Sequence, residues 1–105
     1  MLDKLKSTDF SAYIHQSFSI KLVSTDQETV FGPVEAELVE VNELGSRQKK
    51  GVKRDPFSVI FRCPDDTKMP QQIYLVEHDE LGLLTLFLVP VGPGKTGYLY
   101  EAIFS

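Results

Sequence analysis

The sequence predicts an all-β fold: a small antiparallel β-barrel of six strands with a short N-terminal helix, or, as the alternative, a small sandwich. Short runs rich in Phe, Tyr, Val, Ile and Thr are separated by clusters of Gly, Pro and Asp, which is typical of strands joined by turns. Apolar and polar residues alternate within several of these runs, as in strands with one buried face. The length of 105 residues is that of one domain, spanning 1–105.

The clearest element is a β-hairpin between Leu81 and Phe104. Its first strand, Leu83–Val91, is followed by residues 92–97, where three glycines supply the backbone freedom that a reversal needs. The chain then returns along Tyr98–Phe104. Because Pro90 lacks the N–H that a sheet ladder uses, we expect regular pairing to fail near it.

The first strand of this hairpin is apolar on both faces. Side chains of alternate residues point to opposite sides of a strand, and Thr85 is the one polar side chain in the run. Such a strand is either covered on both sides or meets another chain on its outer face. We predict that one set of leucines forms an exposed face that contacts a protein partner or a second copy: Leu84, Leu86 and Leu88.

The first 16 residues hold the one helix that the sequence predicts. Ser7, Thr8 or Asp9 would cap a short turn. About two turns are too few to be stable alone. We therefore expect Phe10 and Ile14 to pack against the sheet.

Four further strands precede the hairpin: Phe18–Leu22, Val30–Leu44, Pro56–Cys63 and Ile73–His78. The second is long and changes phase, because its apolar residues occupy even positions from Val34 to Leu38 and odd positions at Val39 and Val41. One extra residue near Leu38-Val39 returns the apolar side chains to the same face, which predicts a β-bulge. Bulges bend strands, and bending helps a small sheet to curl into a barrel.

The charge is unevenly distributed. The chain carries a net charge of −4, but a loop within 45–55 contributes +5 without any acid between its first and last basic residue. The rest of the chain therefore carries −9, the difference between those two values. Overall acidity argues against a nucleic-acid partner, whereas the loop itself is a candidate for docking an anionic protein. Its basic residues are Arg47, Lys49, Lys50, Lys53 and Arg54.

No catalytic residue, cofactor site or metal site is predicted. The Gly-Lys-Thr at 94–96 matches the end of a phosphate-binding loop, but that motif needs a glycine where Val89 stands, and a helix after it. Cys63 ends an apolar strand face, so we expect a small buried residue rather than a nucleophile. Glu77 and His78 point to opposite faces of a strand and do not share an ion. For His78 we expect a structural hydrogen bond.

Several motifs of this chain resemble those of a family of small bacterial proteins of unknown function. They are Pro56-Phe57-Ser58, Gln71-Gln72-Ile73-Tyr74, Glu77-His78, Leu81-Gly82, Phe87-Leu88-Val89-Pro90-Val91-Gly92 and Tyr100-Glu101-Ala102-Ile103-Phe104. The resemblance implies an all-β domain and brings no catalytic residues with it. It also suggests relatives near phage-tail-like proteins, and hence an accessory role in such an assembly.

Our leading hypothesis is a non-enzymatic protein-interaction or structural module. The alternative is a small-ligand-binding barrel, or an enzyme of unrecognised type, with an interior pocket formed by Tyr74, His78, Tyr98 and Tyr100. The first residues lack the apolar run of a signal peptide, and no segment has the length and apolar character of a membrane-spanning helix. We therefore expect a cytoplasmic protein without a membrane partner.

Overall fold

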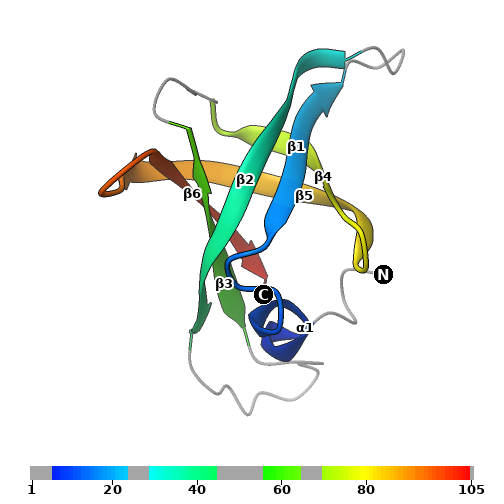
Figure 1. The fold of residues 1–105 in the computed structure, drawn as a ribbon. Helices are drawn as coiled ribbons and strands as arrows, with labels where there is room; N and C mark the ends of the chain where they lie inside the picture. Colours follow the sequence, from blue (N-terminus) through cyan, green and yellow to red (C-terminus); the bar gives the residue numbers. More distant parts are fainter. Residues whose placement is uncertain (1–5, 24–28, 45–55, 65–69, 105) are drawn as a thin grey trace.

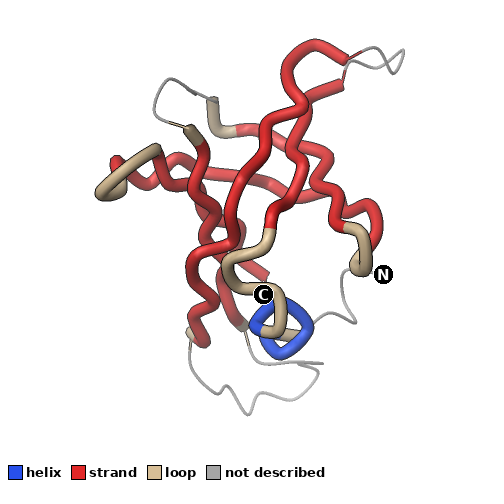
Figure 2. Tube along the Cα trace, viewed as in Figure 1, coloured by secondary structure: helices blue, strands red, loops and turns tan. Residues whose placement is uncertain are grey.

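The computed structural model describes residues 6–23, 29–44, 56–64 and 70–104. Within them lie one short helix and six strands (Figures 1 and 2). Their bounds are α1 Ser7–Ser11, β1 Ser17–Val23, β2 Thr29–Glu43, β3 Phe57–Cys63, β4 Gln72–His78, β5 Gly82–Pro93 and β6 Tyr98–Phe104. None of the helices in these ranges has the length and apolar character needed to cross a membrane.

The six strands form a closed antiparallel barrel in the order β1-β2-β3-β6-β5-β4. The barrel closes where β1 pairs with β4, for example Ile20 with Val76. This confirms the predicted barrel, and the sandwich alternative is not adopted. Closure leaves the sheet without a continuous free edge, which is one way that small β proteins avoid pairing with other chains.

The predicted bulge lies in β2. Leu38 is opposite Phe61 and Glu40 is opposite Ile60, so Val39 is the extra residue between two regular pairs. Leu38 is fully buried, and Val41 packs against the same core. The bulge thus keeps the apolar side chains of both halves of β2 on the inner face, as the phase change in the sequence predicts.

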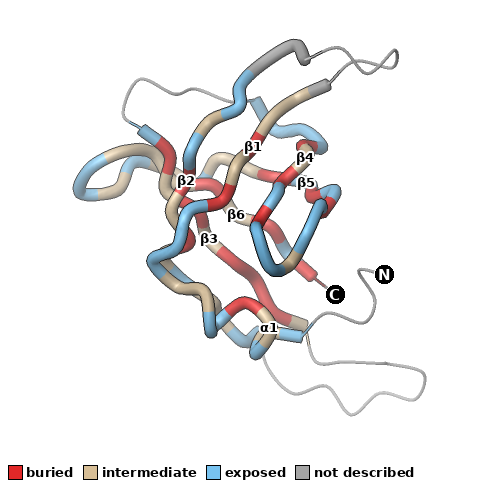
Figure 3. Tube along the Cα trace, turned by 45° about the vertical axis from the view of Figure 1, so that its right-hand side comes forward, coloured by how far each residue is buried: buried red, intermediate tan, exposed pale blue. Residues whose placement is uncertain are grey.

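The interior of the barrel is filled by large side chains from every strand. Neighbouring rings are in contact, as between Phe18 and Phe61, whose centroids are 5.2 Å apart. The largest fully buried side chains are Tyr74, Tyr100, Phe10, Phe18, Phe57, Phe61, Ile20, Leu38, Leu88, Val59, Val76 and Cys63. Figure 3 shows the alternation of buried and exposed positions along β4 and β5.

α1 packs against the barrel through Phe10, which is fully buried. The Phe10 ring lies 5.9 Å from that of Phe57 and 5.3 Å from that of Phe104. Ile14 is partly buried against the same core, so the predicted packing of both residues is confirmed. The cap differs from the prediction: Lys6 occupies the N-cap position, and its N–H donates to the Asp9 carboxylate at 2.8 Å.

β5 is shared between two neighbours. Its first part, from Gly82 to Leu88, pairs with β4, and its second part, from Val89 to Pro93, pairs with β6. The register shifts between Pro90 and Gly92, where the sequence predicts that pairing fails. The segment between the β4–β5 turn and this irregularity forms the part of the wall that carries the site described next.

Candidate interaction surface

The inner face of β5 consists of Leu84, Leu86 and Leu88, which are 8%, 3% and 0% exposed. The prediction that these leucines form an exposed face is therefore wrong. The reason lies in the register, because Leu84 is opposite Val76 and Leu86 is opposite Tyr74, and paired residues point to the same side of a sheet. Val76 and Tyr74 are buried, so the leucines beside them are buried as well.

The exposed apolar face of β5 is the opposite one. Leu83 and Phe87 are 59% and 49% exposed, and Ile73 on β4 is 56% exposed. Ile73 and Phe87 are paired directly across the ladder, which places their Cβ atoms about 5 Å apart. We call this surface the β4–β5 face and define it by Ile73, Leu75, Leu83, Thr85 and Phe87.

A sequence signal for this assignment was available. The outward set of β5 contains Thr85, the one polar side chain between Leu83 and Val91, and a polar residue is more easily placed on an outer face. The signal is weak, because Thr85 is a single polar residue among eight apolar ones. The two faces of the strand carry similar numbers of apolar side chains, so the sequence gives little reason to prefer either as the inner face.

A hollow of ≈ 590 Å³ adjoins the β4–β5 face. A volume of this size can hold several side chains of a binding partner. The hollow lies on the outside of β4, next to the exposed rings and methyl groups described above. The side chains around it are neutral and include two amides. Its lining residues are Leu22, Gln71, Gln72, Ile73, Tyr74, Leu75, Thr85 and Phe87.

Charged residues surround the β4–β5 face. Glu77 is opposite Leu83, and Glu101 of β6 is opposite Val89 of β5. Lys21 of β1 is opposite Leu75. The β4–β5 turn adds Asp79 and Glu80, both of which are exposed. The surroundings of this apolar surface are thus mainly acidic.

His78 holds the β4–β5 turn in place. Its Nδ1 accepts hydrogen bonds from the backbone N–H groups of Glu80 (3.1 Å) and Leu81 (3.3 Å). Its Nε2 is 2.8 Å from Oε1 of Gln16, so the ring proton is on Nε2 and donates to that oxygen. The predicted structural role of His78 is confirmed.

In the described part of the chain, no group of three or more His, Cys, Asp or Glu is placed to hold a metal ion.

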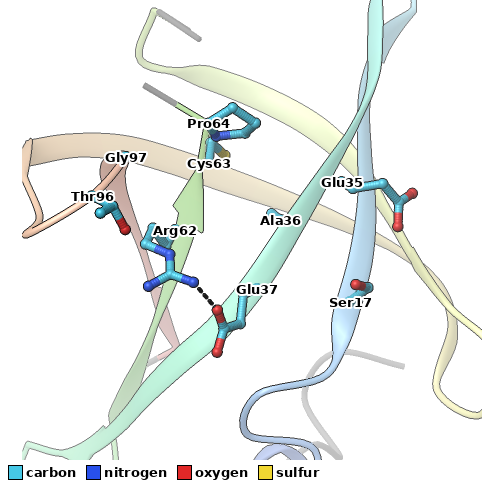
Figure 4. Close-up of a pocket in the computed structure, with 9 residues that line it drawn as sticks. All are labelled: Ser17, Glu35, Ala36, Glu37, Arg62, Cys63, Pro64, Thr96 and Gly97. Atoms are coloured by element: carbon cyan, nitrogen blue, oxygen red, sulfur yellow. Dashed lines mark hydrogen bonds and ion pairs between the residues drawn. The ribbon is translucent and has the colours of Figure 1, made fainter. Parts of the chain in front are cut away.

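A second hollow, of ≈ 400 Å³, lies where β2 and β3 separate. Figure 4 shows the Arg62 guanidinium donating to the Glu37 carboxylate beside it. The other oxygen of Glu37 is 2.7 Å from Nδ1 of His15. The hydrogen bond from His15, assisted by the positive charge of Arg62, holds the pKa of Glu37 below its ordinary value. Both oxygens of the Glu37 carboxylate are therefore engaged within the chain.

Cys63 also lines this second hollow, and it is 1% exposed. Burial raises the pKa of the Cys63 thiol to about 11, so the sulfur is protonated at neutral pH. A protonated thiol is a poor nucleophile, and the prediction of a small buried residue is confirmed.

The alternative of an interior pocket formed by Tyr74, His78, Tyr98 and Tyr100 remains a prediction, and of these four residues Tyr74 lines the ≈ 590 Å³ hollow. Tyr74 and Tyr100 are fully buried within the packed core. The Tyr74 hydroxyl donates to the carbonyl oxygen of Pro70 at 2.6 Å, and Tyr98 packs against the ring of Tyr100. Both hollows described above are open to the outside of the barrel.

The predicted basic loop falls outside the described residues. Arg47, Lys49, Lys50, Lys53 and Arg54 all lie in 45–55, so their proposed contact with an anionic partner remains a prediction.

In a comparison with protein families, residues 5–104 match a family described as "Domain of unknown function (DUF6916)". The chain belongs to this family. The predicted resemblance to a family of small domains of unknown function is thereby confirmed, and the matched region includes the whole barrel. Neither the curated proteins nor the solved structures contain a match.

Proposed function

We propose that this domain is a non-enzymatic protein-interaction module that docks a partner through the β4–β5 face. The observation that carries the proposal is the pairing of Ile73 and Phe87 on the outer wall, where each leaves about half of its surface in water. Apolar residues scattered singly over a surface need no explanation. Two large ones in register, beside an uncharged hollow, form a continuous surface of the kind that marks an interaction site.

The size of the effect can be estimated from the exposed area. A large aromatic side chain has about 150–250 Å² of surface, so covering the exposed half of Phe87 removes about 100 Å² from water. At about 25 cal/mol per Å², this contributes roughly 2.5 kcal/mol to binding. A contribution of that size corresponds to about seventyfold in affinity, which makes Phe87 a suitable centre for a contact.

The rest of the described structure supports an interaction role more than a catalytic one. The thiol of Cys63 is protonated, His78 is engaged on both ring nitrogens, and the Glu37 carboxylate is held by His15 and Arg62. Each of these groups has a structural function in the barrel. An accessory role in a phage-tail-like assembly is a narrower form of the proposal, and only the sequence resemblance supports it.

The proposal is tested by affinity capture from the native host with three forms of the chain as bait. Wild type and Val91→Ser should retain the same partner, whereas Phe87→Ser should lose it. Val91 is a matched control, because it is an apolar residue of β5 with a similar exposure, 47%, and does not line the hollow. Circular dichroism verifies that all three are folded. A set of captured proteins that is identical for all three baits would contradict the proposal.

A further inference from the structure

The charges around the β4–β5 face indicate what kind of partner it fits. We infer that the partner is a different protein, whose contact surface has an apolar centre flanked by Lys and Arg side chains. This inference rests on the proposed function and adds the chemistry of the partner to it.

The sign of the rim follows from the strand register. Glu77 and Glu101 are placed next to apolar members of β5 by their ladders, and Asp79 and Glu80 follow in the turn. The one basic side chain that the described ladders place beside the face is Lys21. Together these five residues carry a net charge of −3, from four acids and one base.

The carboxylate of Glu80 is held in position. Its Oε2 accepts a hydrogen bond from the Tyr13 hydroxyl at 3.0 Å. This bond, with burial and the negative charge of the carboxylate, raises the pKa of Tyr13 above its ordinary value. Tyr13 thus stays a neutral donor, and the carboxylate of Glu80 is held beside it at the β4–β5 turn.

A second copy of the chain does not fit this surface. In a two-fold symmetric contact the same patch lies on both sides, so the acidic rim of one copy would face that of the other. Like charges at an interface oppose association. The three half-exposed side chains supply about 300 Å² of apolar area, well below the ~800 Å² per partner of a stable interface. A partner with a basic rim removes the repulsion and extends the contact beyond the apolar centre.

The inference is tested with a random 12-residue peptide library displayed on phage, selected against the immobilised protein. We expect enriched peptides to combine aromatic or aliphatic residues with Lys or Arg. Binding of a synthetic enriched peptide, measured by fluorescence anisotropy, should fall at least tenfold with Phe87→Ser and remain unchanged with Val91→Ser. Ile73→Ser provides a second variant in case Phe87→Ser does not fold.

The contribution of the acidic rim to binding is tested with separate variants. Glu77→Lys should weaken binding of the enriched peptide at least fivefold, and higher salt should weaken binding to wild type, because exposed charges are screened. Glu40→Lys makes the same change at an exposed position of β2, opposite Ile60, and should leave binding unchanged.

The outcomes separate the two levels of the proposal. Two results would contradict a basic partner while leaving docking at this face intact. In the first, peptides require Phe87 but contain no excess of Lys or Arg; in the second, their binding is unchanged by Glu77→Lys. No enrichment beyond that obtained with Phe87→Ser would overturn the proposed function itself. Light scattering should give the mass of a monomer; a dimer that Phe87→Ser dissociates would show that the partner is a second copy.

Discussion

Replacing Leu86 by alanine tests which face of β5 is inside the barrel. Leu86 is 3% exposed and lies opposite the buried Tyr74. The change removes about three carbon atoms from the core, worth about 2.4 kcal/mol in transfer free energy, and leaves a partly filled cavity that adds to the loss. We therefore expect the free energy of unfolding to fall by about 3 kcal/mol, within the range typical of buried leucines.

The matched change is Phe87→Ser. Phe87 directly follows Leu86 in the chain and lies on the opposite face of β5. Phe87 is 49% exposed, so its replacement leaves no enclosed cavity, and we expect a smaller loss of stability than for Leu86→Ala. Urea unfolding followed by far-ultraviolet circular dichroism measures both variants; the chain has no Trp, so tryptophan fluorescence is not a probe. The midpoint should fall with little change in slope.

The result that would refute this reasoning is a reversed or equal pair of effects. If Leu86→Ala costs less than about 1 kcal/mol, or if Phe87→Ser costs as much as Leu86→Ala, then the even-numbered residues of β5 do not form its inner face. The β4–β5 face would then not be an outer surface, and the proposed docking site would fail with it.

Three further predictions concern the core, the thiol and the pH dependence. Phe10→Ala should destabilise the barrel by about 3–5 kcal/mol, because Phe10 is fully buried; thermal unfolding measures it, and a loss below 1 kcal/mol would contradict the packing of α1. Cys63, with its pKa of about 11, should react with a thiol reagent at pH 8 only after urea is added, and fast labelling of the folded protein would contradict its burial. The pKa of Glu37 in the folded protein is below its ordinary value of 4.5. Its interactions with Arg62 and His15 therefore stabilise the fold fully above pH 4.5, and this stabilisation is lost as the pH falls through the pKa of the folded state. The difference in urea midpoint between wild type and Glu37→Gln should therefore shrink between pH 7 and pH 3, and a constant difference would contradict it.

The interaction hypothesis and the acidic rim have a common structural origin. β4 and β5 are joined by a short turn that carries Asp79 and Glu80, and the same turn is fixed by the hydrogen bonds of His78. The apolar side chains of the face therefore lie on regular strands, whose positions the ladder defines. A site on paired strands is already ordered before a partner binds, so little conformational entropy is lost on docking.

Local patterning in the sequence was enough to predict the strands, the bulge and the irregularity at Pro90. Alternation with a period of two depends only on neighbouring residues, and the phase change around Leu38-Val39 requires one extra residue whatever the partner strand is. The same is true of Pro90, whose missing N–H interrupts a ladder in any fold.

The tertiary structure alone decided which face of β5 is exposed and which charges surround it. Both faces of the strand are apolar, so its orientation follows from the register with β4, where Leu86 meets Tyr74 and Phe87 meets Ile73. The acidic rim is assembled from residues far apart in the sequence, such as Glu77 and Glu101, through pairings of β5 with two different strands. A pattern along one strand contains no information about its neighbours, and the contact surface is a property of the neighbours.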